Sequence, residues 1–506
     1  MRGKSIMFQG TGSSVGKSML CTAMCRIFKQ DGLRVAPFKA QNMVLNSFAT
    51  SEGLEMGRAQ VTQAEAAGIE PSAMMNPVLL KPTSDRKSQV IVNGKSLGTM
   101  TAMEYHEYKP QLRKMVKETY DRLESLVDVV VIEGAGSPAE INLREGDIVN
   151  MSMANAADAP VILIGDINLG GVFASLLGTV MLLTEEERRR VQGIVINKFR
   201  GDVKILEPGL KMLEDMIHIP VIGVIPWTDI DMEDEDSVTD RFQRTMGSGE
   251  IRVAIVRLEH ISNFTDFNLL SAEEGVSVQY VTRPGQIADA DIVLLPGSKN
   301  TIEDLNALRR NGMADALVRH ARAGKLLIGI CGGYQMLGER LMDPHYSESR
   351  IPETTGLGLL PMDVTFNENK TTVQADGAIH TNIPWLAELN GTMVDGYEIH
   401  SGENTFREGC HPFIELRHRG GVELRQPDGV MNAQGNVMGT YLHGIFDQGG
   451  LWRCIVNRVR AQRGLDQISG DSLTMAEYRE REFDRLADLV RQNMDMDRVY
   501  RILRGE

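Results

Sequence analysis

One of the five cysteines stands where a short apolar run meets a pair of glycines. Cys331 follows LLIGI and precedes GGYQML, which predicts a strand, a tight turn and a helix around the thiol. Such a turn exposes its central side chain, and the N-terminal end of a helix favours a thiolate. Gly332 and Gly333 leave room for a substrate and let backbone N–H groups face an oxyanion. Cys331 is therefore predicted to be a nucleophile, and the alternative is a buried core cysteine.

A cysteine nucleophile also needs a base and an oxyanion site. His443, in GTYLHGIF, follows another apolar run about 110 residues further along the chain. The turn in LLPGSKNT supplies Gly297 as a second candidate donor loop. Each feature alone has an ordinary structural explanation. Together and in this order, they predict a cysteine-based catalytic site.

A second group of residues has the pattern of a phosphate-binding loop. GTGSSVGKS lies between an apolar run and an amphipathic segment, where backbone N–H groups and a helix N-terminus can surround a phosphate. Lys17 is expected to reach the β- and γ-phosphates of ATP, and Ser18 to ligate Mg²⁺. A structural glycine turn is the alternative. The predicted ATP-binding loop comprises Gly10, Thr11, Gly12, Ser13, Ser14, Val15, Gly16, Lys17 and Ser18.

Further polar residues follow apolar runs in the same half of the chain. Lys39 follows the second run, where strand ends in a doubly wound sheet face the ligand. Glu133 ends DVVVIE and is predicted to join Ser18 at the metal. Asn197, in VINKF, could bind an adenine edge, since its amide both donates and accepts. A solvated lysine and a strand-capping acid are the alternatives for the first two.

Apolar, β-branched runs that alternate with helical segments predict an α/β protein with doubly wound parallel sheets. The pattern stops after Pro226, and a new series of runs begins with IRVAIVRL. We expect two doubly wound domains and a helical C-terminal extension. The predicted boundaries are 1–230 for the phosphate-loop domain, 231–250 for an acidic linker, 251–448 for the cysteine-containing domain, and 449–506 for the extension.

Composition narrows the class of protein. The 506 residues are 42% hydrophobic and 24% charged, with a formal net charge of −14. This balance is ordinary for a globular protein and argues against a general nucleic-acid or membrane binder. Cys21 and Cys25 lack further metal-ligating neighbours and are expected in the core. The odd cysteine count and the lack of a long apolar segment predict a cytoplasmic protein. The sequence does not fix the oligomeric state, and a homo-oligomer is possible.

Both halves resemble known families. The loop, with Gly10 six residues before Gly16, resembles that of dethiobiotin-synthetase-like ATPases. Residues 251–448 resemble the class I glutamine amidotransferase domain, which implies that Cys331 attacks the side-chain amide of glutamine and that His443 moves the protons. Commoner members carry Glu two residues after the histidine, where this chain has Ile445. The resemblance therefore supports a Cys–His pair without a complete triad.

The combination resembles the corrinoid amidases of cobalamin biosynthesis. PFKAQNMVLNS, GRAQVTQAEAAG and MNPVLLKP are similar to segments of the cobyric acid synthase family over nearly the whole chain. That resemblance implies ATP- and glutamine-dependent amidation of the b, d, e and g carboxylates of adenosylcobyrinate a,c-diamide. Three alternatives stay open: a cobyrinate a,c-diamide synthase, a regulatory P-loop ATPase with a non-catalytic amidase-like binding module, and a cysteine hydrolase with an unrelated nucleotide-binding domain.

Overall fold

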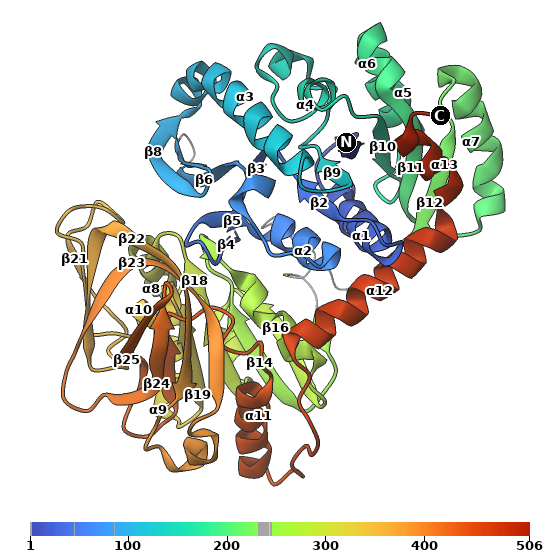
Figure 1. The fold of residues 1–506 in the computed structure, drawn as a ribbon. Helices are drawn as coiled ribbons and strands as arrows, with labels where there is room; N and C mark the ends of the chain where they lie inside the picture. The colour runs from blue at the N-terminus through green and yellow to red at the C-terminus, as the bar shows by residue number, and fades with distance from the viewer. Residues whose placement is uncertain (1–2, 45, 85–86, 231–241, 243–244) are drawn as a thin grey trace. The chain divides into compact units, whose positions relative to one another are not determined.

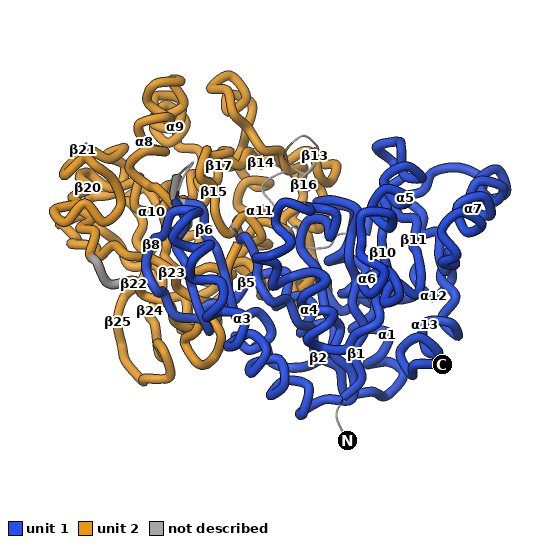
Figure 2. Tube along the Cα trace, turned by 90° about the horizontal axis from the view of Figure 1, so that it is seen from above, with its two compact units in different colours: residues 1–44, 55–235, 479–506 blue, residues 45–54, 236–478 orange. Residues whose placement is uncertain are grey.

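The computed structural model describes residues 3–44, 46–84, 87–230, 242 and 245–506. The chain forms two compact units, which Figure 1 shows as a ribbon and Figure 2 colours separately. Unit 1 comprises residues 1–44, 55–235 and 479–506, and unit 2 comprises residues 45–54 and 236–478. Among the described helices, none combines the length and the apolar character needed to cross a membrane.

Unit 1 is built on a six-stranded parallel sheet with the strand order β12-β11-β10-β1-β9-β2. The strands are the apolar runs of the sequence: β1 (Lys4–Gly10), β2 (Val35–Phe38), β9 (Val129–Glu133), β10 (Val161–Asp166), β11 (Val191–Phe199) and β12 (Val221–Pro226). The helices between them are α1 (Lys17–Gln30), α2 (Arg58–Ala67), α3 (Ala102–Glu124), α4 (Met151–Ala156), α5 (Val172–Leu182), α6 (Glu185–Arg190) and α7 (Val203–Ile217). The predicted α/β fold is confirmed for this unit.

Unit 1 also contains a small second sheet, in the order β3-β6-β7-β8, that the apolar pattern did not predict. Its strands are β3 (Gln41–Met43), β6 (Val78–Ser84), β7 (Lys87–Val92) and β8 (Lys95–Thr101), and β5 (Glu55–Gly57) precedes α2. β8 is mostly exposed and therefore has no continuous apolar run.

The predicted C-terminal extension is not a separate part of the molecule. α11 (Gly450–Gln462) belongs to unit 2, the division between the units falls inside α12 (Met475–Asn493), and α13 (Met496–Arg504) belongs to unit 1. Phe483, Val490 and Val499 share one buried cluster with Phe8 of β1 and Phe28 of α1. The terminal helices are amphipathic, and burying their apolar faces completes the core of unit 1.

Unit 2 contains a twelve-stranded mixed sheet. Its parallel part, in the order β16-β14-β17-β19-β26, consists of β14 (Ile251–Val256), β16 (Val276–Val281), β17 (Ile292–Leu295), β19 (Leu326–Ile330) and β26 (Val437–Thr440). The same sheet continues through β20 (Arg340–Met342), β21 (Glu353–Thr355), β22 (Met362–Ile379), β23 (Met393–Phe406), β24 (His411–Arg419) and β25 (Val422–Met431). The predicted parallel sheet is therefore joined to a mainly antiparallel one.

The remaining elements of unit 2 are short. They are β4 (Ser47–Ala49), β13 (Thr245–Gly247), β15 (Ile261–Ser262), β18 (Gly297–Ser298), α8 (Thr301–Arg310), α9 (Met313–Arg322), α10 (Gly332–Met336) and the 3₁₀ segments Phe264–Ala272, Pro284–Ile287 and Pro384–Leu389. Of the predicted linker, residues 231–241 and 243–244 lie outside the described residues. Residues 245–247 are β13, which pairs antiparallel with β16, so this end of the predicted linker is part of the sheet.

Candidate functional sites

The glycine-rich loop connects β1 to α1, as the sequence predicted. Gly16, just before α1, has a φ of +98°, and a Cβ there would lie 2.0 Å from the Asn197 amide nitrogen. Only glycine fits both constraints. A Cβ at Gly12 would meet nothing within 4 Å, so the loop has open space on that side. Lys17 Nζ donates to the carbonyl oxygens of Gly12 (2.9 Å) and Gly136 (3.2 Å), which holds the ammonium over the loop.

The structure brings the two predicted metal ligands together. Ser18 Oγ donates to Glu133 Oε1 at 2.8 Å, and Lys39 Nζ binds the same oxygen at 2.9 Å. Both members of the Lys39–Glu133 ion pair are buried, so water screens their attraction little. A hydroxyl beside a carboxylate is a hard-oxygen donor set that suits Mg²⁺. These residues therefore fit the predicted ion.

Two glutamines of α2 complete the surroundings of Glu133. Gln63 Nε2 donates to Glu133 Oε2 at 2.6 Å, and Gln60 Nε2 donates to the same oxygen at 3.4 Å. Sequence reasoning assigned neither residue a role. The available signal was their spacing in GRAQVTQAEAAG, because residues three apart share one face of a helix.

The other predicted residues of unit 1 have different surroundings. Asn197 Nδ2 donates to the carbonyl of Val15 at 2.8 Å, so the amide supports the phosphate loop. Asn197 Oδ1 has no hydrogen-bond partner among the described residues. Burial raises the pKa of the Cys21 thiol, and the charge of Glu133 raises it further. Burial also raises the pKa of Cys25. Both cysteines are fully buried, as expected for core residues.

In unit 2, Cys331 lies at the predicted strand–turn–helix junction. Its φ of +51° and ψ of −110° are unusual for a residue with a side chain, and such strain is typical of functional turns. The neighbouring glycines allow close packing: a Cβ at Gly332 would lie 2.7 Å from Ser298 N, and one at Gly333 would lie 1.9 Å from Leu295 O. The following helix, α10, has only five residues, so its field favours a thiolate less than a long helix would.

His443 lies within hydrogen-bonding reach of Cys331, so the structure brings the predicted nucleophile and base together. Its Nδ1 is 2.7 Å from Asp266 Oδ2, and Gly444 N donates to Asp266 Oδ1 at 3.2 Å. Burial alone lowers the pKa of His443. The charge and hydrogen bond of Asp266, together with Cys331, outweigh burial and raise that pKa to about 10. The imidazolium form is therefore favoured at neutral pH, beside the thiol.

Asp266 is the functional candidate that sequence reasoning missed. It occupies the orienting position left open by Ile445, but it comes from the 3₁₀ segment Phe264–Ala272. A carboxylate at the second nitrogen of a histidine selects the tautomer and stabilises the imidazolium. No local sequence pattern marks this residue, since polar and apolar residues are mixed around it in NFTDFNLL.

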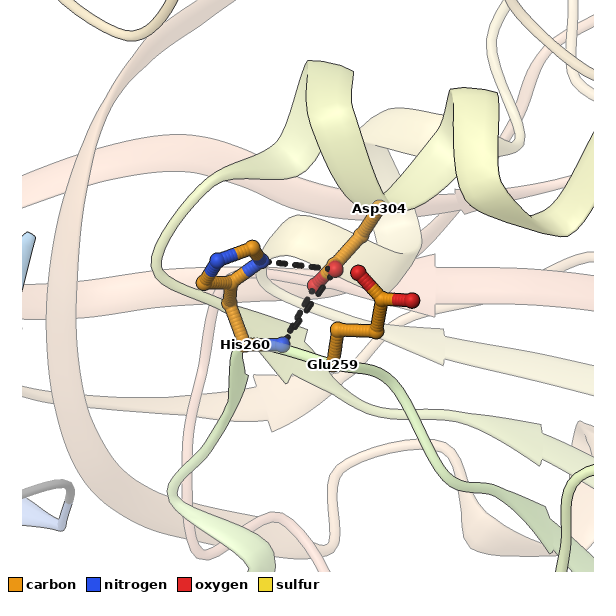
Figure 3. Close-up of side chains that lie close together, drawn as sticks. All are labelled: Glu259, His260 and Asp304. Atoms are coloured by element: carbon orange, nitrogen blue, oxygen red, sulfur yellow. Dashed lines mark hydrogen bonds and ion pairs between the residues drawn. The ribbon is translucent and has the colours of Figure 1, made fainter. Parts of the chain in front are cut away.

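The third predicted element, the Gly297 turn, is held against the same centre. A Cβ on Gly297 would lie 3.5 Å from His443 Cε1, so this backbone lies directly beside the imidazole. The buried Asp304 supports the turn by accepting hydrogen bonds from Ser298 Oγ (2.6 Å) and from His260 N and Nδ1 (Figure 3). Glu259 lies beside this pair. Both oxygens of Asp304 already accept hydrogen bonds. We therefore assign the cluster of Glu259, His260 and Asp304 the role of supporting the Gly297 turn.

A pocket of about 320 Å³ is lined by residues of β22 and β23. Cys331 Sγ contacts the carbonyl of Ile399 in β23 at 3.5 Å, and Ser401 and Glu403 of the same strand line the pocket. Lys370 lines it as well, and burial followed by the charge of Lys370 lowers the pKa of the buried Lys299. The pocket therefore offers side chains of both charge signs, and one of the strands that line it, β23, also contacts the Cys331 thiol.

Comparison with known proteins identifies a family for each half of the chain. Residues 6–237 match the family described as the CobQ/CobB/MinD/ParA nucleotide binding domain. Residues 252–450 match the CobB/CobQ-like glutamine amidotransferase domain. The fold and the two centres thus define a glutamine amidotransferase with its own nucleotide-binding domain.

The full-length relatives narrow this class. The chain is 55% identical over 503 residues to the cobyric acid synthase of Alkaliphilus metalliredigens, with 99% of this chain and 100% of the relative covered. It is 52% identical to that of a Thermoanaerobacter species, with 98% of each chain covered. It is 51% identical to that of Salmonella dublin, with 99% of this chain and 98% of the relative covered. The chain belongs to the cobyric acid synthase family.

Proposed function

We propose that this protein amidates the b, d, e and g carboxylates of adenosylcobyrinate a,c-diamide, with ATP to activate each carboxylate and glutamine to supply nitrogen. The observation that carries the proposal is the buried Cys331–His443–Asp266 arrangement in a chain that also holds a phosphate loop. A non-catalytic binding module has no need of a buried imidazolium beside a thiol. Free cysteines and the family's metabolic role support a cytoplasmic place of action.

Cys331 is the proposed nucleophile for glutamine hydrolysis. Its thiolate attacks the side-chain amide carbon, and His443 gives a proton to the departing nitrogen, so that ammonia leaves and a glutamyl thioester remains. Water then attacks the thioester, releasing glutamate and restoring the thiol. Asp266 holds the ring of His443 in position throughout. Backbone N–H groups next to Gly297 and Gly332 are the proposed oxyanion donors.

The charged pocket is proposed to bind the amino-acid end of glutamine. Lys370 suits the α-carboxylate, and Glu403 suits the α-ammonium. Glu403 belongs to β23, whose Ile399 contacts the Cys331 sulfur, and Lys370 belongs to β22, which pairs with β23. Glutamine bound in this way can extend its amide towards the thiol.

The phosphate loop is proposed to activate the carboxylate acceptor. A carboxylate has a poor leaving group, and transfer of the γ-phosphoryl group of ATP gives an acyl phosphate that ammonia can attack. Lys17 and Lys39 supply positive charge for this transfer, which consists mostly of positioning and charge neutralisation. Ser18 and Glu133 are the residues that would hold Mg²⁺, which supplies further neutralisation of the phosphates when bound.

Glutamate release and corrinoid products, measured together, test this proposal. The full-length protein should release glutamate and convert the a,c-diamide to products with up to four further amides, each a mass decrease of about one dalton. Offered cobyrinic acid instead, it should leave the a and c carboxylates free. Amidation at a and c would assign the chain to the a,c-diamide synthases. Glutamate release that is never accompanied by amidation would identify a simple cysteine hydrolase.

A further inference from the structure

A group of side-chain amides lies buried beside Glu133 in unit 1. Asn42, Gln60, Gln63 and Asn76 are each no more than 3% exposed. They come from β3, from helix α2 and from the residue that follows the 3₁₀ turn Ala73–Met75. An amide both donates and accepts hydrogen bonds, and a buried amide is stable only when both functions are satisfied. The partners of these amides therefore show what the cluster can bind.

The orientation of three of these amides is fixed by partners that can only accept. Asn76 Nδ2 donates to the carbonyl oxygen of Lys39 at 2.8 Å. Gln63 Nε2 donates to Glu133 Oε2 at 2.6 Å, and Gln60 Nε2 donates to the same carboxylate oxygen at 3.4 Å. Carbonyl and carboxylate oxygens have no proton to give, so the amide nitrogens face them and the amide oxygens point elsewhere.

Two of these amide oxygens have no donor within the described part of the chain. Asn76 Oδ1 and Gln63 Oε1 are buried, and neither accepts a hydrogen bond from a described residue. Gln60 Oε1 accepts one from Asn42 Nδ2 at 2.9 Å, and an amide oxygen has room for a second. A buried acceptor that lacks a donor destabilises the fold. The cluster is therefore short of hydrogen-bond donors.

Gly57, between β5 and α2, lets two of the acceptor oxygens converge. A Cβ at this position would lie 2.7 Å from Asn76 Oδ1 and 3.1 Å from Gln60 Oε1. The backbone of Gly57 is extended, with a φ of −69°, so its dihedral angles do not require glycine. The surroundings of the position therefore explain the glycine. Two acceptors that face one place repel each other unless a donor binds both.

The proposed reaction supplies a small donor of this kind. Ammonia has three N–H bonds, whereas the carboxylate to be amidated has no proton to give and would be repelled by the amide oxygens. Lys39 Nζ lies 2.9 Å from Glu133 Oε1, and this buried cation favours uncharged ammonia over ammonium beside it. Glu133 also accepts from Ser18, the proposed metal ligand, at 2.8 Å. A ligand of the amide cluster would therefore lie next to the centre that activates the carboxylate.

We propose that Gln60, Gln63 and Asn76 form an ammonia-binding site in unit 1. This inference rests on the proposed function and deepens it, because it names the residues that receive the nitrogen. The amide oxygens bind hydrogens of ammonia and leave its lone pair free to attack the carbonyl carbon of the acyl phosphate. The C–N bond forms, the C–O bond to the phosphate breaks, and one proton of the ammonia leaves with the phosphate as hydrogenphosphate.

The test measures amidation of the a,c-diamide by the full-length protein with ATP and ammonium at alkaline pH, which bypasses glutamine hydrolysis. Asn76→Ala removes one acceptor, and Gly57→Ala adds a Cβ that displaces the oxygens of Asn76 and Gln60. Each variant should raise the KM for ammonia about three- to tenfold, the factor expected for one lost hydrogen bond. The KM values for ATP and for the a,c-diamide should stay within about twofold. Glu70→Gln, an exposed change shortly before Asn76, should alter none of them.

Methylamine in place of ammonium separates a binding site from a support of the fold. The wild-type protein should form almost no N-methylamide, because the amides that bind the nitrogen are enclosed. Asn76→Ala makes room beside the remaining acceptors and should form N-methylamides, which mass spectrometry distinguishes from the ordinary amides. A variant that is merely less stable loses activity with every substrate and makes no new product.

Several results would overturn the ammonia site. They are an unchanged KM for ammonia in both variants, an equal rise of all KM values, and use of methylamine by the wild-type protein as readily as ammonia. A raised KM for the a,c-diamide alone would also overturn it, and would assign the amides to a carboxamide group of the corrinoid. A wild-type protein that forms no corrinoid amide even with ammonium would refute the proposed function itself, which is a distinct outcome.

Discussion

Replacing Asp266 by asparagine tests the arrangement around His443 most directly. The substitution keeps the size of the side chain but removes its charge. One of its two acceptor oxygens becomes a donor, so either His443 or Gly444 N loses its acceptor. The side chains of His443 and Asp266 are only 1% and 3% exposed, so water cannot replace the lost partner.

The magnitude follows from this geometry. A hydrogen bond to a charged group contributes about 1.5–3 kcal/mol, and about 1.4 kcal/mol corresponds to a factor of ten in rate. Asp266→Asn should therefore slow glutamine-dependent amidation about 10- to 150-fold. Amidation with ammonium should not change, because that reaction does not use His443.

The pH dependence gives a second, independent expectation. Asp266 raises the pKa of His443 to about 10, so the imidazolium persists through neutral pH and is lost as the pH rises towards that value. Removing the carboxylate lowers the pKa of His443, and burial then favours the neutral ring. The alkaline limb of glutaminase activity should move to lower pH, and the deficit of the variant should grow between about pH 7 and 9.

The assay measures glutamate release and corrinoid amidation across this pH range, with Asp395→Asn as the control. Asp395 is an exposed carboxylate in β23, two residues before Tyr397, and its loss should leave both activities unchanged. A variant at Asp266 with wild-type rates and an unshifted pH profile would refute the proposed orienting role. Equal loss of both nitrogen sources would show instead that Asp266 supports the fold.

Four further variants probe the remaining parts of the two centres. Lys17→Ala should abolish ATP-dependent amidation with either glutamine or ammonium in a folded protein, and retained amidation with ATP turnover would exclude the phosphate-loop assignment. Cys331→Ala should reduce glutamine-dependent amidation to background, because no thioester can form. The variant should retain amidation with high ammonium at alkaline pH. His443→Ala should also lower glutamine-dependent amidation, though less completely, and retain amidation with ammonium. Loss of both activities in either variant would contradict separate centres. Lys370→Gln should raise the KM for glutamine about tenfold or more with little change in kcat, since it removes a charge contact that bound glutamine already makes before the reaction. An unchanged KM would show that glutamine binds elsewhere.

The sequence by itself determined the elements that carry the chemistry. Cys331, Gly297 and the loop from Gly10 to Ser18 each follow a continuous apolar run and precede a helix or a turn. Such strand–turn–helix junctions depend on consecutive residues, so they can be recognised locally. The same reasoning placed His443 after β26 and Glu133 at the end of β9, and the parallel order of the sheets then brought each beside its expected neighbour.

Only the tertiary structure decided which side chains support these residues. Asp266 lies 177 residues before His443 and belongs to an irregular segment, so no periodic pattern connects the two. Gln63 reaches Glu133, at the end of β9, from helix α2, and Phe48 of β4 reaches Tyr397 of β23, which lies far away in the sequence. Local backbone preferences extend over a few residues, whereas such contacts form only when separate elements bury their apolar faces together. The packing of the folded units therefore selects the supporting residues, while the local sequence selects the reactive ones.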